Sequence, residues 1–220
     1  MYEKEKEILK AKDKFDIDDL RLIVKILRAP GGCPWDAEQT HKSIIPGMIE
    51  ECYEVVEAIE AQSPTMLTEE LGDVLLQIVF HAQIEEENGV FDFNAAVTDV
   101  CKKMIVRHPH VFGDVIAEDS ATVLKNWDNI KAQTKEQKSL REKLDSIAKP
   151  LPALIRAQKV MHKTVKEMPF PTPNTSDKLS ADEVRIGKML ADAIAECEKL
   201  DIQAETVLRH YTDAIINSVK

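Results

Sequence analysis

Two groups of acidic residues are spaced so that they could hold a metal ion. Glu50, Glu51 and Glu54 form a Glu-Glu-x-x-Glu motif, and Glu70 and Asp73 follow as a second pair three residues apart. Residues three and four apart share one face of an α-helix, so two neighbouring helices would direct these carboxylates toward a common point. Carboxylate oxygens are suitable ligands for a hard divalent cation. The spacing predicts a metal site, although acidic residues spaced like this are also common on solvated helix faces.

The segment that carries the second pair indicates that such a site is partly buried. Residues 74–84 are mostly apolar, and on a helical wheel their side chains surround the helix, which predicts a helix buried on all sides. One polar stripe remains along this helix, formed by Glu70, Asp73, Gln77 and His81. A carboxylate buried without a partner is strongly disfavoured, so the stripe needs cations, hydrogen bonds or internal water.

Composition and charge narrow the class of protein. The 220 residues are rich in Ala, Leu, Glu and Lys and poor in aromatics, which favours an all-α protein. The net charge of −10 argues against binding of a nucleic-acid backbone, but a few cations and Mg²⁺ could still neutralise a nucleotide. Residues 1–14 lack the apolar core of a signal peptide, and no apolar run reaches membrane-spanning length. We expect a cytoplasmic protein that binds neither nucleic acid nor membrane.

Helix-breaking residues divide the chain into the elements that would position these groups. We expect a break at 29–36, after which Asp36 and Gln39 restart a helix as a capping pair. Pro46 either begins or kinks the helix of the first acidic motif. The buried helix opens at Thr68 or in the preceding turn and ends near residue 88. An irregular loop is expected at 168–174. The other expected helices cover residues 16–27, 94–107, 120–144, 153–166, 181–199 and 204–219.

An internal similarity links the two halves of the chain. Residues 70–75 can be aligned with residues 185–190, and in each half a second helix is expected after a short turn. Such a pattern predicts duplication. Arg185 and Lys188 stand where the first half has Glu70 and Asp73, so the second half could not bind a metal in the same way.

Four longer motifs resemble one known family. They are Gly-Cys-Pro-Trp-Asp at 32–36, the acidic motif at 50–54, Glu-Glu-Leu-Gly-Asp at 69–73, and Arg-His-Pro-His-Val-Phe-Gly-Asp at 107–114. Together they closely resemble the MazG nucleoside triphosphate pyrophosphohydrolases, strongly over residues 15–131 and more weakly to the end. The resemblance implies a helical bundle of the all-α NTP pyrophosphatase type, built from two tandem repeats. Residues 1–148 would be the catalytic domain and 149–220 a degenerate second repeat.

The resemblance also implies an activity and the residues that perform it. Relatives are dimers that depend on Mg²⁺, for which Mn²⁺ could substitute, and hydrolyse nucleoside triphosphates to the monophosphate and pyrophosphate. Lys103 and Arg107 would then hold the triphosphate, and Trp127 would contact the base or sugar. Val106 departs from the family pattern, since relatives often have a second arginine there. The implied metal ligands are Glu51, Glu54, Glu70 and Asp73.

Hydrolysis of a nucleoside triphosphate at the α-phosphorus needs an activated water, neutralised phosphate charge and in-line geometry. Glu50 and Glu51 are both candidates for the general base. We expect a homodimer that hydrolyses ribo- and deoxynucleoside triphosphates with broad base tolerance. The alternative is a helical regulatory module that binds Mg²⁺ and nucleotide with little turnover, which the altered second repeat would suit.

Four further residues have more than one interpretation. Trp35 could anchor its loop on the core, which we favour, or the loop could close over a nucleotide. His81 could support a carboxylate or be an ordinary core histidine. His108 and His110 flank a proline where a helix should stop, which favours a structural role.

Overall fold

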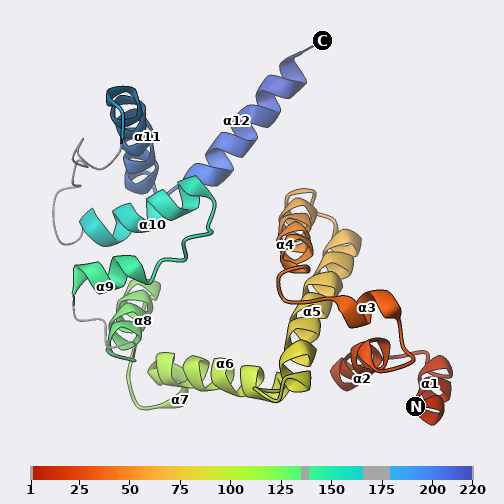
Figure 1. Ribbon diagram of the computed structural model, residues 1–220. Helices are drawn as coiled ribbons and strands as arrows, with labels where there is room; N and C mark the ends of the chain where they lie inside the picture. The colour runs from red at the N-terminus through yellow and green to blue at the C-terminus, as the bar shows by residue number, and fades with distance from the viewer. Residues whose placement is uncertain (1, 135–138, 166–178, 220) are drawn as a thin grey trace. The chain divides into compact units, whose positions relative to one another are not determined.

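The computed structural model describes residues 2–134, 139–165 and 179–219, and this part of the chain is all-α (Figure 1). Within these ranges there are twelve helices and no strand, in agreement with the composition. None of the helices found there combines the length and the apolar character needed to cross a lipid bilayer. The helices are α1 (Glu3–Lys10), α2 (Ile17–Arg28), α3 (Pro34–Glu38), α4 (Ile45–Glu60), α5 (Pro64–Glu87), α6 (Phe93–Arg107), α7 (Pro109–Phe112), α8 (Ser120–Thr134), α9 (Leu140–Asp145), α10 (Ala153–Val165), α11 (Ala181–Lys199) and α12 (Ala204–Ser218).

The chain divides into two compact units, Met1–Val115 and Ile116–Lys220. The first unit contains α1 to α7 and the second contains α8 to α12. The expected catalytic domain at 1–148 and second repeat at 149–220 rest on sequence resemblance rather than on compactness. They stay predictions.

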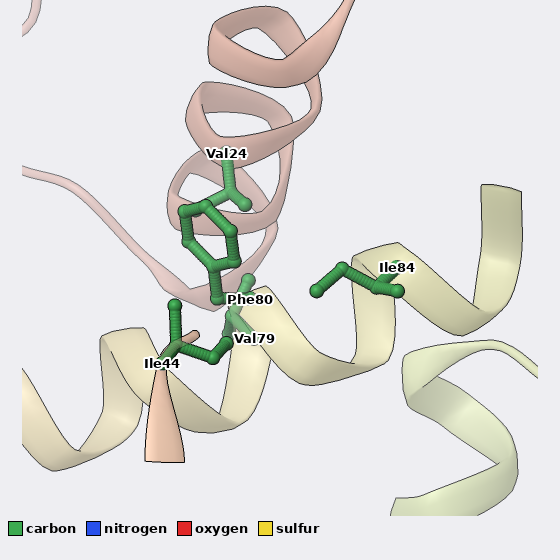
Figure 2. Close-up of a cluster of buried hydrophobic side chains, with 5 residues drawn as sticks. All are labelled: Val24, Ile44, Val79, Phe80 and Ile84. Carbon is green, nitrogen blue, oxygen red and sulfur yellow. The ribbon is translucent and has the colours of Figure 1, made fainter. Parts of the chain in front are cut away.

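The core of the first unit lies where α2 and the start of α4 meet the C-terminal half of α5 (Figure 2). Val24, Ile44, Val79, Phe80 and Ile84 are all buried and form one cluster. Burial of a side chain of this size stabilises the fold by about 1.5 to 3 kcal/mol relative to exposure. The cluster therefore fixes α2 and the beginning of α4 on α5.

Helices α4 and α5 form an antiparallel hairpin that is set up by local sequence signals. Pro46 lies in the first turn of α4, where a missing backbone N–H removes no helical hydrogen bond. Ser63 caps α5 by accepting a hydrogen bond from the backbone N of Met66 at 3.4 Å. Only residues 61–63 join the two helices, which forces them to pack side by side. The first acidic motif on α4 therefore lies beside the second on α5.

Several expected helix boundaries are wrong. Asp36 does not restart a helix: it lies inside α3, which begins at Pro34 because proline favours the first helical position. By contrast, helix α5 opens at Pro64, in the turn that precedes Thr68, which agrees with one of the two expected starts. The expected run at 120–144 contains two helices in its described part, since Ser139 and Glu142 form a capping box that starts α9. The expected loop at 168–174 lies outside the described residues.

The expectation that α5 is buried on all sides is also wrong. Its C-terminal half is buried, but Leu71, Leu75 and Ile78 are 52%, 37% and 40% exposed. Helix α4 exposes a stripe of its own, made of Ile45, Ile49 and Tyr53 at intervals of four residues. Within the described part of the first unit, no helix covers these two exposed apolar stripes. A helix that is apolar all round needs neighbours on every side, and one chain supplies α5 with neighbours on only some sides.

The second unit is organised around α10. Met161 of α10 packs with Ile194 of α11 and Ala204 of α12. The buried side chain of Gln158 accepts a hydrogen bond from the backbone N of Ala204 at 2.9 Å and donates one to the carbonyl of Ile202, also at 2.9 Å. This amide therefore holds the beginning of α12 against α10.

Candidate metal and nucleotide site

The hairpin brings acidic side chains from both of its helices together. Glu51 of α4 and Glu70 and Asp73 of α5 each offer a carboxylate oxygen, and these oxygens all lie within 4.8 Å of one another. Glu54 joins the group because its carboxyl group hydrogen-bonds with those of Glu51 and Glu70. The four sequence-predicted ligands therefore form one acidic cluster, and all four are half-buried. Their role as metal ligands stays a prediction.

A close approach of the two helices lies one turn from this cluster. Gly47 faces Gln77, and a Cβ atom at position 47 would lie 3.0 Å from Gln77 Nε2. That separation is tighter than an ordinary van der Waals contact, so the amide of Gln77 fills the space that a larger residue at 47 would need. The glycine therefore lets α4 and α5 lie close together beside the carboxylates.

The electrostatics of the cluster are those of carboxylates held near one another. Partial burial raises the pKa of Glu51, and the hydrogen bond with Glu54 and the negative charge of Asp73 raise it further. Partial removal from water also raises the pKa of Glu70, and the charges of Glu54, Glu69 and Asp73 add to this effect. Both shifts show that the ionised cluster is disfavoured without a positive partner. A divalent cation would supply that partner.

The donor set agrees with Mg²⁺ or Mn²⁺. Every potential ligand in the cluster is a carboxylate oxygen, which is the ligand type that these hard cations prefer. No thiol or imidazole belongs to the cluster, so the features of a typical zinc site are missing from it. The residues present therefore fit a hard divalent cation.

The two candidate bases occupy different surroundings. Glu51 belongs to the acidic cluster, whereas Glu50 is exposed and lies outside it. Adjacent residues on an α-helix point about 100° apart, so Glu50 and Glu51 cannot share one narrow site. The structure therefore brings Glu51, and not Glu50, into the acidic cluster, and the role of either residue as a base stays a prediction.

The proposed phosphate-binding cations are not brought to the acidic cluster within one chain. Lys103 and Arg107 lie on α6, which leaves the C-terminal end of α5 and runs away from the α4–α5 hairpin (Figure 1). Lys103 forms an ion pair with Asp99 of the same helix, with Nζ and Oδ2 2.5 Å apart.

The two tryptophans differ in their surroundings. Trp127 lies half-buried on α8 of the second unit, and its predicted contact with a base or sugar stays a prediction. Trp35 is 65% exposed on α3, so the expectation that it anchors its loop on the core is wrong.

The loop around Trp35 is instead held by Arg28, which the sequence did not single out. The Arg28 side chain is only 6% exposed, and its Nη1 atom donates to the carbonyls of Asp36 at 2.7 Å and Gln39 at 3.1 Å. Its guanidinium also stands 5.2 Å from the ring centre of Phe80. A basic residue at the end of an amphipathic helix usually points to solvent, so no sequence signal distinguished Arg28.

His108 and His81 have hydrogen-bond partners outside the acidic cluster. His108 Nδ1 lies 2.6 Å from the carbonyl oxygen of Met104, which satisfies a helix end as expected. His81 contacts no member of the acidic cluster in any described interaction. It lies against His41, with the two Nδ1 atoms 2.8 Å apart.

The first unit is all-α, and carboxylates from two of its helices lie together. These features are those of a helical protein with a candidate divalent-metal site. Residues 39–112 match the family of the MazG nucleotide pyrophosphohydrolase domain. This chain therefore carries a MazG nucleotide pyrophosphohydrolase domain, and the matched range contains α4, α5, α6 and the whole acidic cluster.

Curated relatives agree with this family. The chain is 48% identical over 145 residues to a nucleoside triphosphate pyrophosphohydrolase of Escherichia coli K12, covering 66% of this chain and 55% of the relative. It is 46% identical over 143 residues to the nucleoside triphosphate pyrophosphohydrolase/pyrophosphatase MazG of Thermotoga maritima, covering 65% and 54%. A relative from Mycobacterium tuberculosis, also called a nucleoside triphosphate pyrophosphohydrolase, is 36% identical over 173 residues, covering 76% and 51%. The chain spans about half the length of these three relatives.

Proposed function

We propose that this chain is a Mg²⁺-dependent nucleoside triphosphate pyrophosphohydrolase that accepts ribo- and deoxynucleotides with broad base tolerance. The observation that carries the proposal is the convergence of Glu51, Glu70 and Asp73 inside a MazG domain. The names of the relatives support the same activity. Mn²⁺ would substitute for Mg²⁺ because both cations accept oxygen ligands.

In this proposal each residue has a separate task. A divalent cation held by Glu51, Glu54, Glu70 and Asp73 supplies charge neutralisation to the phosphates and makes water more acidic. Glu51 accepts the proton of the attacking water, since it lies within the cluster. Lys103 and Arg107 stabilise the charge that builds up on the leaving pyrophosphate, Arg107 through two parallel hydrogen bonds.

The proposed enzyme is a homodimer. A second copy would cover the two exposed apolar stripes, whose burial supplies the driving force for association. It would also bring α6 of one protomer to the acidic cluster of the other, which supplies Lys103 and Arg107 to the phosphates. The course of α6 away from its own hairpin supports this arrangement (Figure 1).

We also propose that the C-terminal part is a degenerate second repeat. Residues 70–75 lie in α5 and residues 185–190 lie in α11, and each of these helices is followed by another after a short turn. Gly72 and Gly187, which correspond in the alignment, both face open space. Arg185 and Lys188 pair with acidic neighbours on α11 itself, which suits a structural part.

Phosphorus NMR of the products tests the activity. The full chain is incubated with Mg²⁺ and a panel of ribo- and deoxynucleoside triphosphates in ¹⁸O-labelled water. Monophosphate plus pyrophosphate, with the label in the monophosphate, is the expected result, because it places the attack at the α-phosphorus. Nucleoside diphosphate plus orthophosphate would overturn the mechanism. Nucleotide binding without turnover would favour the regulatory module instead.

A pair of neighbouring variants ties the activity to the acidic cluster. Glu70→Gln removes a proposed ligand, whereas Glu69→Gln changes the adjacent exposed residue and serves as the matched control. We expect Glu70→Gln to lower turnover about 100-fold or more, and Glu69→Gln to change it little. Equal activity of the two variants would remove the cluster from the mechanism.

A further inference from the structure

A second group of titratable side chains lies at the other end of the α4–α5 hairpin, away from the acidic cluster. His41 lies in the connection between α3 and α4, while His81 and Glu85 lie one turn apart on α5. The Nδ1 atoms of the two histidines are 2.8 Å apart, and His41 Nε2 is 2.6 Å from Glu85 Oε1. These contacts join the connection to α5.

The two imidazole rings are aligned for one shared proton. Their planes differ by 6° and their centroids are 5.1 Å apart. If both Nδ1 atoms lie on the line between the ring centroids, the centroid separation equals the Nδ1···Nδ1 distance plus the distance from each centroid to its own nitrogen. The observed separation is close to this sum, so each ring points its Nδ1 atom at the other. A straight N–H···N bond of this kind is a strong arrangement.

Counting protons shows which states keep the contacts. The ionised carboxylate of Glu85 only accepts, so Nε2 of His41 carries a hydrogen. In neutral His41 the Nδ1 atom then accepts, and His81 donates its Nδ1–H to it. One further proton can bind at Nε2 of His81 without breaking either bond. A second further proton would place two N–H groups head to head between the rings.

The surrounding charges leave Glu85 as the carboxylate in contact with the pair. Burial lowers the pKa of His81, and the neighbouring His41 lowers it further. The basic residues of α2 are engaged elsewhere, since Lys25 pairs with Glu86 and Arg28 pairs with Glu87, both at 2.8 Å. The other charged residues of the adjoining elements are Asp36 and Glu38 of α3, Lys42 of the connection, Glu50, Glu51, Glu54, Glu57 and Glu60 of α4, Asp92 at the cap of α6, and Asp99, Lys102, Lys103 and Arg107 of α6.

We propose that His41, His81 and Glu85 form a proton-dependent latch, which holds the α3–α4 connection on α5 while the histidine pair carries at most one extra proton. Binding of a second extra proton breaks the bond between the rings and releases the connection. The latch is independent of the proposed catalytic activity, because none of its groups belongs to the acidic cluster. It controls the segment that leads from the exposed Trp35 into α4.

Ring nitrogen NMR of the full-length protein tests the latch without any substitution. The protonation of each histidine is followed from about pH 8 to about pH 5, the range in which histidines titrate. We expect His41 and His81 to titrate as a coupled pair, with the second proton binding at least about tenfold more weakly than the first. Independent titration of the two rings with similar midpoints would overturn the proposal.

Hydrogen exchange tests release of the connection. The backbone N–H groups of Ser43 and Ile44 donate to the carbonyl of Thr40 at 3.1 and 3.3 Å. We expect their protection factors to fall about tenfold across the second titration step, because local opening then becomes easier. Protection that stays constant through this step would overturn the latch even if the rings titrate together.

Two histidine variants give a matched comparison. His41→Gln removes the partner ring, and we expect His81 then to titrate in a single step at higher pH. His210→Gln changes an exposed histidine of the second unit and should leave the titration of His81 unchanged. An unchanged His81 titration in His41→Gln would contradict the proposed coupling.

Discussion

Arg28 donates two parallel hydrogen bonds to Glu87, with Nε 3.0 Å from Oε1 and Nη2 2.8 Å from Oε2. The same guanidinium reaches the loop of α3 through its third nitrogen. One nearly buried cation therefore joins the ends of α2 and α5 to the segment that carries Trp35. Planar arginine suits this position because it can serve several acceptors at fixed angles.

We expect Arg28→Ala to lower the free energy of unfolding of the first unit by about 1 to 3 kcal/mol, because it leaves the part-buried carbonyls of Asp36 and Gln39 and the carboxylate of Glu87 without their partner. Arg28→Lys keeps the charge but not the parallel bonds, so its loss should be intermediate. Urea denaturation followed by circular dichroism measures both. Lys10→Ala removes an exposed ion pair with Glu7 and should change stability by less than about 1 kcal/mol. Equal effects of Arg28→Ala and Lys10→Ala would contradict the bracing role.

The pKa shifts predict that metal-free protein loses stability as the pH rises. The pKa values of Glu51 and Glu70 are raised, so above the ordinary carboxyl range the folded state holds more protons than the unfolded state. Stability therefore falls as the pH rises through the raised values. Melting temperatures in EDTA should show this fall, and Mg²⁺ should remove it. Glu70→Gln should flatten the dependence, and a flat curve in the unsubstituted protein would contradict the repulsion.

The lowered pKa of Glu87 predicts that stability changes with pH in the opposite direction, in a lower pH range. Burial alone would raise its pKa, but the hydrogen bonds from Arg28 and Gln83 outweigh burial and lower it. Its contribution is present above the ordinary carboxyl pKa and is lost as the pH falls below that value toward the lowered one. The melting temperature should therefore drop on acidification below about pH 4, and this drop should be smaller in Glu87→Gln, since Asp19, Asp119 and Glu183 also have lowered pKa values. A drop that persists unchanged in that variant would assign it to other carboxylates.

Neighbouring substitutions on α4 should separate the two candidate bases. Glu51→Gln should lower the turnover number at least about 100-fold and weaken Mn²⁺ binding, because Glu51 belongs to the acidic cluster. Glu50→Gln should change both by less than about threefold, since this side chain is exposed. Electron paramagnetic resonance of Mn²⁺ measures binding separately from turnover. A larger loss in Glu50→Gln would assign the base to Glu50.

A charge in the exposed stripe of α5 should break the proposed dimer. Leu75→Glu places a carboxylate where a partner would bury an apolar side chain, so sedimentation velocity should show a monomer. Val90→Glu introduces the same charge at a position that is 68% exposed outside both stripes and should leave the dimer intact. A monomer in the unsubstituted protein at micromolar concentration would contradict the dimer itself.

Mixing two inactive variants tests whether the site is shared between protomers. Glu70→Gln should disable the cluster, and Arg107→Ala should disable phosphate binding. If α6 acts on the partner, a heterodimer of the two variants has one intact site, and an equal mixture should recover about one quarter of the original activity. Recovery should appear only after subunit exchange, which denaturation and refolding allow. Failure to recover activity would place Lys103 and Arg107 in the same site as their own cluster.

Local patterns allowed the acidic cluster to be predicted. Helical periodicity and a short connection act over a few residues, so they predicted that the two acidic motifs meet. The resemblance to the MazG family then selected Glu51, Glu54, Glu70 and Asp73 within these motifs. The exposure of Leu75 could not be read from the same periodicity, because burial depends on which other helices cover the face.

Contacts between distant residues escaped prediction for a related reason. His41 and His81 are 40 residues apart, and no local sequence pattern predicts their contact. Arg28 and Glu87 are 59 residues apart, and each resembles an ordinary surface charge in its own helix. Both pairs depend on the core that packs α2 and the start of α4 against α5, so they become visible only when the helices are in place.

The acidic cluster lies between two points at which the hairpin is fixed. At one end α4 and α5 are joined through residues 61–63, and at the other Ile44 packs against Val79 and Phe80. Neither helix can move far from the other between these points, so packing, rather than any ion, sets the spacing of the backbone positions that carry the carboxylates. A hairpin of fixed width would sort cations by radius, favouring Mg²⁺ with ligands at about 2.0 to 2.1 Å over Ca²⁺ at about 2.3 to 2.6 Å.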